Sequence, residues 1–135
     1  MVSRVRDQPV ANDSGQDRPI DLRTLLGRWV NYNEHSTGIS RVEIDTWEGI
    51  PTVRVFGAGP PASMIDWGEA AGAVFADGVG GREAVAFNVT FDLVFAHVLL
   101  TGCLNRRLLV IDAYSIFADR SGRADYFQRD NFYRP

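Results

Sequence analysis

The sequence predicts an all-β domain: an eight-stranded antiparallel up-and-down barrel preceded by a short N-terminal helical turn. Three observations carry this prediction. Apolar residues recur at every second position in several segments, which is the period of a strand with one buried face. Short clusters of Gly, Asp, Asn and Ser separate these segments, and connections of that length join antiparallel neighbours. Closure into a barrel would also remove exposed sheet edges.

The chain has 135 residues, of which 45% are hydrophobic, and this size and composition predict one packed domain. Residues 1–20 hold little that can be buried, so we expect a disordered leader there and a single barrel domain over residues 21–135. Asp21 is placed to cap a helical turn whose leucines recur three and four residues apart, and Gly27 ends that turn. From Gly27 onward the apolar period changes to two.

Eight strands are expected along the rest of the chain. They cover residues 28–34, 41–45, 52–55, 71–76, 84–91, 93–101, 107–116 and 124–133. The segment 57–68 is longer than a hairpin requires, and we interpret it as a loop at the barrel mouth. Strands 93–101 and 107–116 are apolar on both faces, so we expect a second copy of the protein to cover them in a homo-oligomer.

Composition excludes several classes of partner and chemistry. The 17 acidic residues outnumber the 14 basic ones, which argues against a nucleic-acid partner. All the basic residues are Arg, so no lysine Schiff base can form. One Cys and two His are too few for a structural zinc site, and we expect neither a metal nor a cofactor. No apolar run reaches about 18 residues and no signal peptide is evident, so we expect a cytoplasmic protein without a membrane partner.

The segment Leu25-Leu26-Gly27-Arg28-Trp29 runs from a helical turn into Gly-x-Trp at the start of the first strand. It resembles the opening motif of the lipocalin and wider calycin barrels. The resemblance implies that Trp29 lies across the closed end of a lipocalin-like barrel, with an Arg near the end of the last strand packed over it. Arg129 and Arg134 are both candidates for that partner.

An eight-stranded barrel is either filled by side chains or left open for one small ligand. Trp67 and Met64 in the predicted loop would form an apolar lid with Asp66 as its polar group, although the same loop could simply plug the barrel. Phe87 and Phe91 would shape the cavity above Trp29. These six residues are the expected contacts of a hydrophobic substrate or ligand.

Four polar residues within strands are candidates for hydrogen bonding to such a ligand. His97, Asn88, Tyr114 and Tyr126 would each orient a carbonyl or hydroxyl group if they faced the cavity. Each could instead face water, the core or a subunit contact. The sequence contains no Gly-x-Ser-x-Gly elbow, phosphate loop, dinucleotide fingerprint or His-Glu-x-x-His motif.

The chain is similar in type to small cytoplasmic β-barrel cyclases of bacterial polyketide and natural-product biosynthesis, in size, acidic charge and lack of a conventional active-site motif. That similarity implies a cofactor-independent cyclase that folds an apolar polyene for intramolecular cycloaddition, with confinement lowering the entropic barrier. The alternative is a carrier that binds a hydrophobic metabolite without catalysis. A third hypothesis is a filled barrel that presents a surface to another protein.

Overall fold

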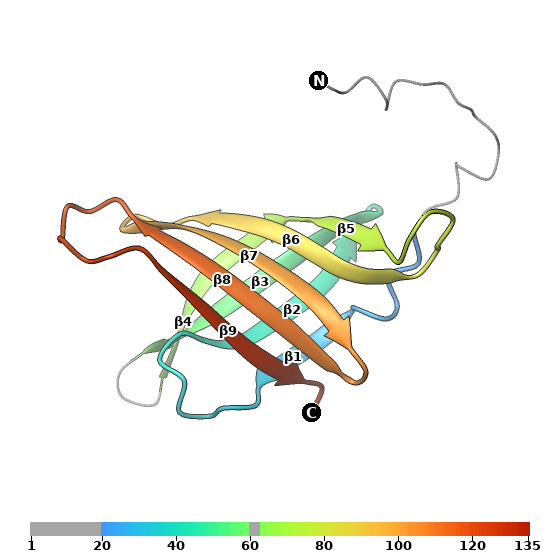
Figure 1. The fold of residues 1–135 in the computed structure, drawn as a ribbon, viewed down its shortest axis with the longest axis horizontal. Coiled ribbons are helices and arrows are strands. Elements are labelled where there is room, and N and C mark those ends of the chain that lie inside the picture. Colours follow the sequence, from blue (N-terminus) through green and yellow to red (C-terminus); the bar gives the residue numbers. More distant parts are fainter. Residues whose placement is uncertain (1–19, 60–62) are drawn as a thin grey trace, which may run out of the picture.

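The computed structural model describes residues 20–59 and 63–135, and these residues form one antiparallel sheet of nine strands. Figure 1 shows the sheet strongly curled, with the strands crossing obliquely on its two sides. Its strands are β1 (Gly27–Asn31), β2 (Ile39–Trp47), β3 (Ile50–Gly59), β4 (Ser63–Ala71), β5 (Ala73–Ala76), β6 (Ala84–Asp92), β7 (Ala96–Asn105), β8 (Leu108–Phe117) and β9 (Tyr126–Tyr133). The predicted all-β antiparallel class is confirmed.

The sheet is not closed into a barrel. Its strand order is β4-β3-β2-β1-β9-β8-β7-β6-β5, so β4 and β5 are the two edges although only Gly72 separates them in the chain. A Cβ on Gly72 would lie 2.9 Å from the carbonyl oxygen of Asn88, and this close approach explains the glycine. The chain therefore stops pairing with β3 before Gly72 and starts pairing with β6 after it. An unpaired seam runs beside β4, where the prediction expected the closed wall of a barrel.

The prediction of a loop over residues 57–68 is corrected. The predicted loop 57–68 is the end of β3 and most of β4, apart from residues 60–62, which lie outside the described residues. β4 is an edge strand exposed over most of its length, so it lacks the alternation that marks a half-buried strand. Where the sequence predicted a short helical turn, the structure has a hydrogen-bonded turn and no helix: the amide nitrogens of Leu25 and Leu26 donate to the Leu22 carbonyl at 2.9 and 3.1 Å.

The cap of that turn is present, because the Arg23 amide donates to Asp21 Oδ1 at 3.0 Å. Residues 1–19 of the expected leader lie outside the described residues.

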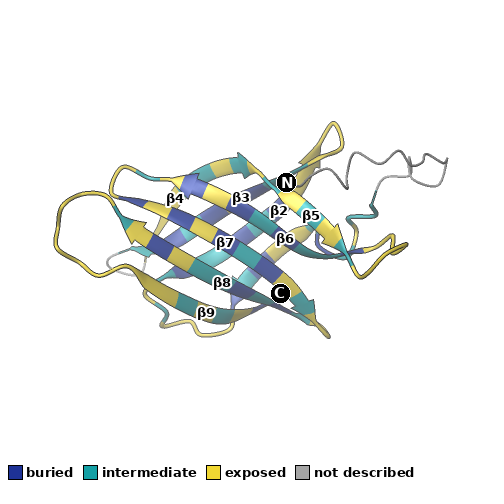
Figure 2. Ribbon diagram, turned by 45° about the horizontal axis from the view of Figure 1, so that its top comes forward, coloured by how far each residue is buried: buried dark blue, intermediate teal, exposed yellow. Residues whose placement is uncertain are grey.

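The core fills the middle of the curled sheet. Buried residues alternate with exposed ones along most strands, and Figure 2 shows this as bands across the ribbon. The largest fully buried side chains are Trp29, Phe87, Phe132, Leu25, Leu100, Leu109 and Ile111. Phe87 lies so close to Gly102 that a Cβ there would collide with its ring. Phe87 is therefore packing in the core, whereas the sequence placed it on a cavity wall.

One end of the sheet is sealed around Trp29, which is 1% exposed. Its indole Nε1 donates to the Leu25 carbonyl at 2.9 Å, and the Arg134 guanidinium lies 4.4 Å from the ring centroid. Arg134 also donates to the carbonyls of Thr24 at 2.7 Å and Leu26 at 2.8 Å. The arginine expected over Trp29 is thus Arg134. Trp29 closes this end, and together with Arg106 and Arg134 it lines a hollow of about 520 Å³ there.

Candidate functional site

A recess of about 430 Å³ opens at the opposite end of the sheet, where β8 ends and β9 begins. This volume is within the usual range of small-molecule sites, roughly 300 to 1,000 Å³. Its walls come from the starts of β2 and β9, the ends of β3 and β8, the first half of β4 and the turn between β6 and β7. The lining residues are Thr37, Gly38, Ile39, Gly57, Ala58, Ile65, Asp66, Trp67, Leu93, Val94, Phe95, Ala113, Ser115, Tyr126 and Gln128.

Small residues keep this end hollow. Ala113 and Ser115 occupy the inward positions of β8 that Leu109 and Ile111 fill deeper in the core. Gly57 makes room for Trp67, since a Cβ on Gly57 would lie 2.6 Å from the indole Nε1.

Trp67 forms the recess wall at the seam. It is the extra residue of a bulge in β4, where the pairing with β3 shifts between Val55 and Phe56. Its ring meets that of Phe91 on β6 edge to face, with centroids 5.8 Å apart. Trp67 and Phe91 therefore bridge the seam through side chains where β4 and β6 have no paired backbone.

The carboxylate of Asp66 holds the bulge in place. Its Oδ2 lies 2.5 Å from Arg54 Nη2, and its Oδ1 accepts a hydrogen bond from the Gly68 amide at 2.8 Å. The hydrogen bond from Arg54, followed by that from Gly68, lowers the pKa of Asp66 below its usual value. Asp66 thus forms a structural ion pair at the rim, and no other Asp, Glu, Arg or His of residues 20–59 and 63–135 lines the recess.

The polar side chains deeper in the recess lack partners of their own. Ser115 is only 7% exposed, yet its hydroxyl makes no hydrogen bond within residues 20–59 and 63–135. The side chains of Gln128, Tyr126 and Trp67 likewise make none within that part of the chain. Their hydroxyl, amide and indole groups line the hollow and are therefore available to bond an occupant of the recess.

Some of the predicted site residues meet at this recess. Trp67, Asp66 and Tyr126 line it, and Phe91 contacts Trp67. Sequence reasoning missed Ser115 and Gln128. The signal for Ser115 was the change to small residues at Ala113 and Ser115 in a strand otherwise filled by large ones.

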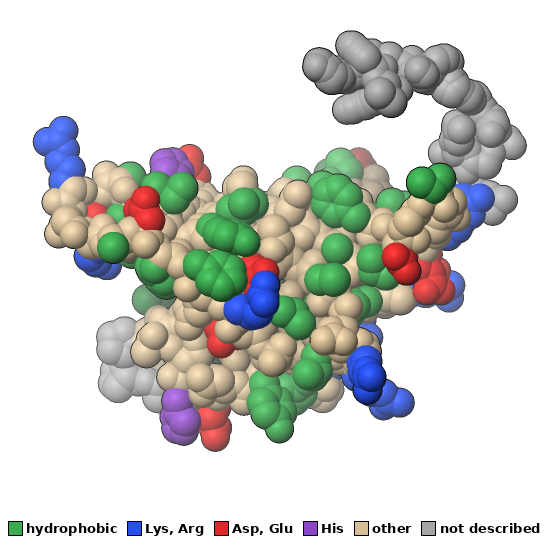
Figure 3. All heavy atoms as spheres, in the orientation of Figure 1, with side chains coloured by type: hydrophobic (Ala, Val, Ile, Leu, Met, Phe, Trp, Pro, Cys, Tyr) green, Lys and Arg blue, Asp and Glu red, His purple; other side chains and the backbone are tan. Residues whose placement is uncertain are grey.

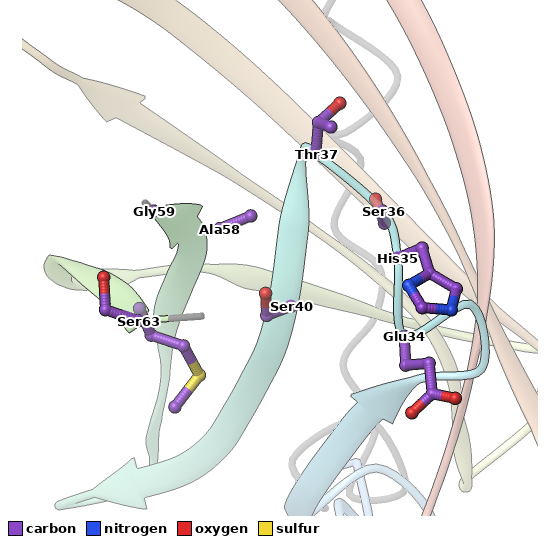
Figure 4. Close-up of a pocket in the computed structure, with 9 residues that line it drawn as sticks. Glu34, His35, Ser36, Thr37, Ser40, Ala58, Gly59 and Ser63 are labelled. Atoms are coloured by element: carbon purple, nitrogen blue, oxygen red, sulfur yellow. The ribbon is translucent and has the colours of Figure 1, made fainter. Parts of the chain in front are cut away.

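Met64 lies elsewhere, in a larger hollow of about 700 Å³. Figure 4 shows its walls: the loop carrying Glu34 and His35 on one side, and Ser40 and the β3–β4 ends on the other. Six of its nine lining residues are polar, and Met64 is the one large apolar side chain among the nine. We therefore place the candidate site in the smaller, more apolar recess.

The other three hydrogen-bonding candidates lie on the outer face of the sheet. His97 Nδ1 is 2.5 Å from Asp92 Oδ1, and both side chains are mostly exposed. Tyr114 is exposed and its ring lies 5.1 Å from that of Phe127. Asn88 is half-buried and pairs in register with Thr101, away from the recess. None of the three lines the recess.

This outer face carries exposed apolar side chains from neighbouring strands. Leu99, Tyr114 and Phe127 are direct cross-strand neighbours on β7, β8 and β9, and Ile116 is exposed beside them. Figure 3 shows apolar side chains grouped on the front of the molecule, where these strands lie. The expected self-association through β7 and β8 stays a prediction, which sedimentation at micromolar concentration would test.

No helix in the described part of the chain is long and apolar enough to cross a membrane. Residues 20–59 and 63–135 also contain no cluster of three or more His, Cys, Asp or Glu arranged to hold a metal ion. No family model, curated protein or solved structure matches this chain. The recess and its lining residues are therefore the features that point to a function.

Proposed function

We propose that this protein binds a small, largely apolar molecule in the recess between Trp67 and Tyr126. The observation that carries the proposal is Ser115, which is 7% exposed, lines a hollow of about 430 Å³ and makes no side-chain hydrogen bond within the described residues. Apolar walls with a few unpaired polar groups are the usual composition of small-molecule sites. Ile65 and Leu93 add apolar surface to the lining of the recess.

The seam offers a way in. Along β4 and the end of β6 the two walls are joined by the Trp67–Phe91 ring contact and not by strand pairing. An aromatic pair of this kind contributes about 0.5 to 1.5 kcal/mol beyond its buried area. Parting the rings would therefore widen the entrance at small cost, without breaking any backbone ladder.

We also propose that β4 and β5 together serve as one bent strand of an eight-stranded, lipocalin-like barrel. β4 pairs with β3, β5 pairs with β6, and Gly72 alone joins them. Closing of the seam over a bound molecule would complete such a barrel.

A second candidate function is cyclisation of a bound polyene of the polyketide type. The observation that favours it is the grouping of Tyr126, Ser115 and Gln128 in one recess, because their free hydrogen-bonding groups could stabilise charge on a conjugated carbonyl. Confinement alone would lower the entropic barrier. Binding without turnover remains the simpler proposal, since it requires only the recess.

The test uses a neutral fluorophore, N-phenyl-1-naphthylamine, whose emission rises in an apolar site. We expect enhanced emission with the unmodified protein and with Ala73→Leu, which adds bulk at an exposed position of β5. Ala113→Leu fills the recess and should abolish the enhancement. Val94→Trp at the exposed rim is a second blocking variant for the case in which Ala113→Leu does not fold. Equal emission from all four proteins would overturn the proposal.

Native mass spectrometry of the protein incubated with extracts of its host separates the two candidates. A bound compound that is released unchanged supports the carrier. A compound released as an isomer of equal mass supports the cyclase, and the blocking variants should then lose the conversion.

A further inference from the structure

We infer that the ligand is uncharged and carries a carboxamide-like group, an N–H donor beside a C=O acceptor, which Gln128 and Ser115 bind. This inference rests on the proposed function and specifies its ligand. Both side chains line the same recess and neither is hydrogen-bonded within the described residues.

The amide of Gln128 is positioned by packing. Gln128 occupies an inward, half-buried position on β9, opposite Ala113 in register. On its other side lies Gly38, where any Cβ would collide with Gln128 Oε1. The glycine therefore leaves room for the amide group against the β2 end of the recess. A primary amide presents a donor and an acceptor in one plane, so it can form two parallel hydrogen bonds with another amide.

Ser115 supplies a further hydrogen-bonding group on the neighbouring strand. It pairs in register with Tyr126, two residues before Gln128, so Ser115 and Gln128 are diagonal neighbours on the inward face. Diagonal cross-strand neighbours lie roughly 7 to 8 Å apart, which leaves space for a small polar group between their side chains. The Ser115 hydroxyl would bond the second lone pair of a carbonyl oxygen held by Gln128.

The charges around the recess disfavour an anionic ligand. The one charged lining residue, Asp66, is neutralised by Arg54 at the rim. Asp130 occupies the next inward position of β9 after Gln128, half-buried and without an ion pair in the described part of the chain. A carboxylate or phosphate in the recess would lose its hydration and gain no cation.

The first experiment compares three ligands of one shape on the full chain: naphthalene, 2-naphthamide and 2-naphthoate. We expect 2-naphthamide to bind about tenfold more tightly than naphthalene, as one or two net hydrogen bonds predict, and 2-naphthoate to bind most weakly. Calorimetry or fluorine NMR of fluorotryptophan-labelled protein would report the affinities. Equal affinity for amide and hydrocarbon, or tight binding of the carboxylate, would overturn the inference.

The second experiment inverts the preference. Gln128→Glu replaces the amide by a group that only accepts hydrogen bonds, so it should lower affinity for 2-naphthamide about tenfold and favour the cationic 2-naphthamidine. Asn131→Asp adds the same charge on the outer face of β9 and should change neither affinity. Gly38→Ala displaces the Gln128 amide without adding charge, and it should remove the preference for the amide while naphthalene still binds.

The outcomes separate the two proposals. If none of the compounds binds the unmodified protein, the proposed function fails. If all bind equally, or if Gln128→Glu and Gly38→Ala leave the amide preference unchanged, the site stands and the role of Gln128 fails.

Discussion

The two ends of the sheet each hold a tryptophan, and they use it in opposite ways. At the sealed end, Trp29 is buried, its indole N–H bonds to a carbonyl, and Arg134 covers its face. At the recess, Trp67 is half-buried, touches Phe91 by one edge, and its N–H has no partner in the described residues. The Trp29 N–H is bonded within the protein and the Trp67 N–H is open to an occupant of the recess, so we expect Trp29 to contribute more to stability than Trp67.

The largest expected effect comes from removing the two rings. Trp29→Ala should lower the free energy of unfolding by about 3 to 5 kcal/mol, the usual cost of emptying a buried aromatic site. Trp67→Ala should cost clearly less, because its ring is only half-buried beside an existing hollow. Urea denaturation of both variants checks this, with Trp47→Ala as the exposed control. Equal losses at Trp29 and Trp67 would break the contrast between the ends.

The next largest effect on stability is expected from Arg134, whose guanidinium lies over the Trp29 ring. Arg134→Ala removes two short hydrogen bonds to carbonyls and the stacking on the ring, and we expect a loss of about 1 to 2 kcal/mol. Arg129→Ala is the matched control, because Arg129 makes an exposed ion pair with Asp112 whose contribution should be about 0 to 1 kcal/mol. Thermal and urea unfolding of both proteins would show whether the sealed end depends on its arginine. A cost at Arg134 no greater than at Arg129 would contradict it.

Ser115→Ala should separate stability from binding. The Ser115 hydroxyl makes no hydrogen bond within the described residues, so its removal should change the free energy of unfolding of the unliganded protein by less than about 1 kcal/mol. The same change should weaken binding of 2-naphthamide severalfold. Unfolding measurements with and without the ligand test both halves. A destabilised free protein would mean that Ser115 belongs to the structural network and not to the site.

The smallest effect is expected in acid and involves one carboxylate at each end. The hydrogen bonds from Arg23 lower the pKa of Asp21 to about 2, and the bond from Arg54 lowers that of Asp66. Because both folded pKa values lie below the unfolded value, these ion pairs stabilise the fold at neutral pH, and their contribution is lost as the pH falls through the folded pKa. NMR titration of the carboxyl carbons would check the values. Asp21→Asn should remove its share of the acid dependence, and an Asp21 titration near 3.8 would contradict the expectation.

The sealed end was predictable from sequence to a degree that the recess was not. Gly27-Arg28-Trp29 and a C-terminal arginine are local signals, and the structure places Arg134 over Trp29 as expected. The recess depends on which way each strand faces. The residues around His97 in β7 are apolar on both faces of the strand, so the sequence does not indicate which face is buried. In the structure His97 lies on the exposed face.

The site also depends on an edge strand with no periodic signal. The sequence predicts a loop where most of β4 lies. Trp67 and Asp66, which that loop was expected to place at a ligand cavity, both line the recess. Ser115 and Gln128 look like ordinary strand residues until their neighbours are known. Gln128 lies opposite Ala113 and beside Gly38, and Ser115 lies opposite Tyr126, and none of these neighbours is adjacent in the sequence.

Gly72, the single residue between the edge strands β4 and β5, has a consequence for the order of the strands along the chain. β1 and β9 are paired in the middle of the sheet, where Val30 lies opposite Tyr133. If the chain began at β5 and its present ends were joined by a linker, the strands would follow one another in sequence in the same order as in the sheet. Opened at Gly72, the molecule becomes a simple meander in which every pairing is between consecutive strands. A circular permutant cut at Gly72 would thus keep every strand pairing and would release the edge strands β4 and β5 from one another.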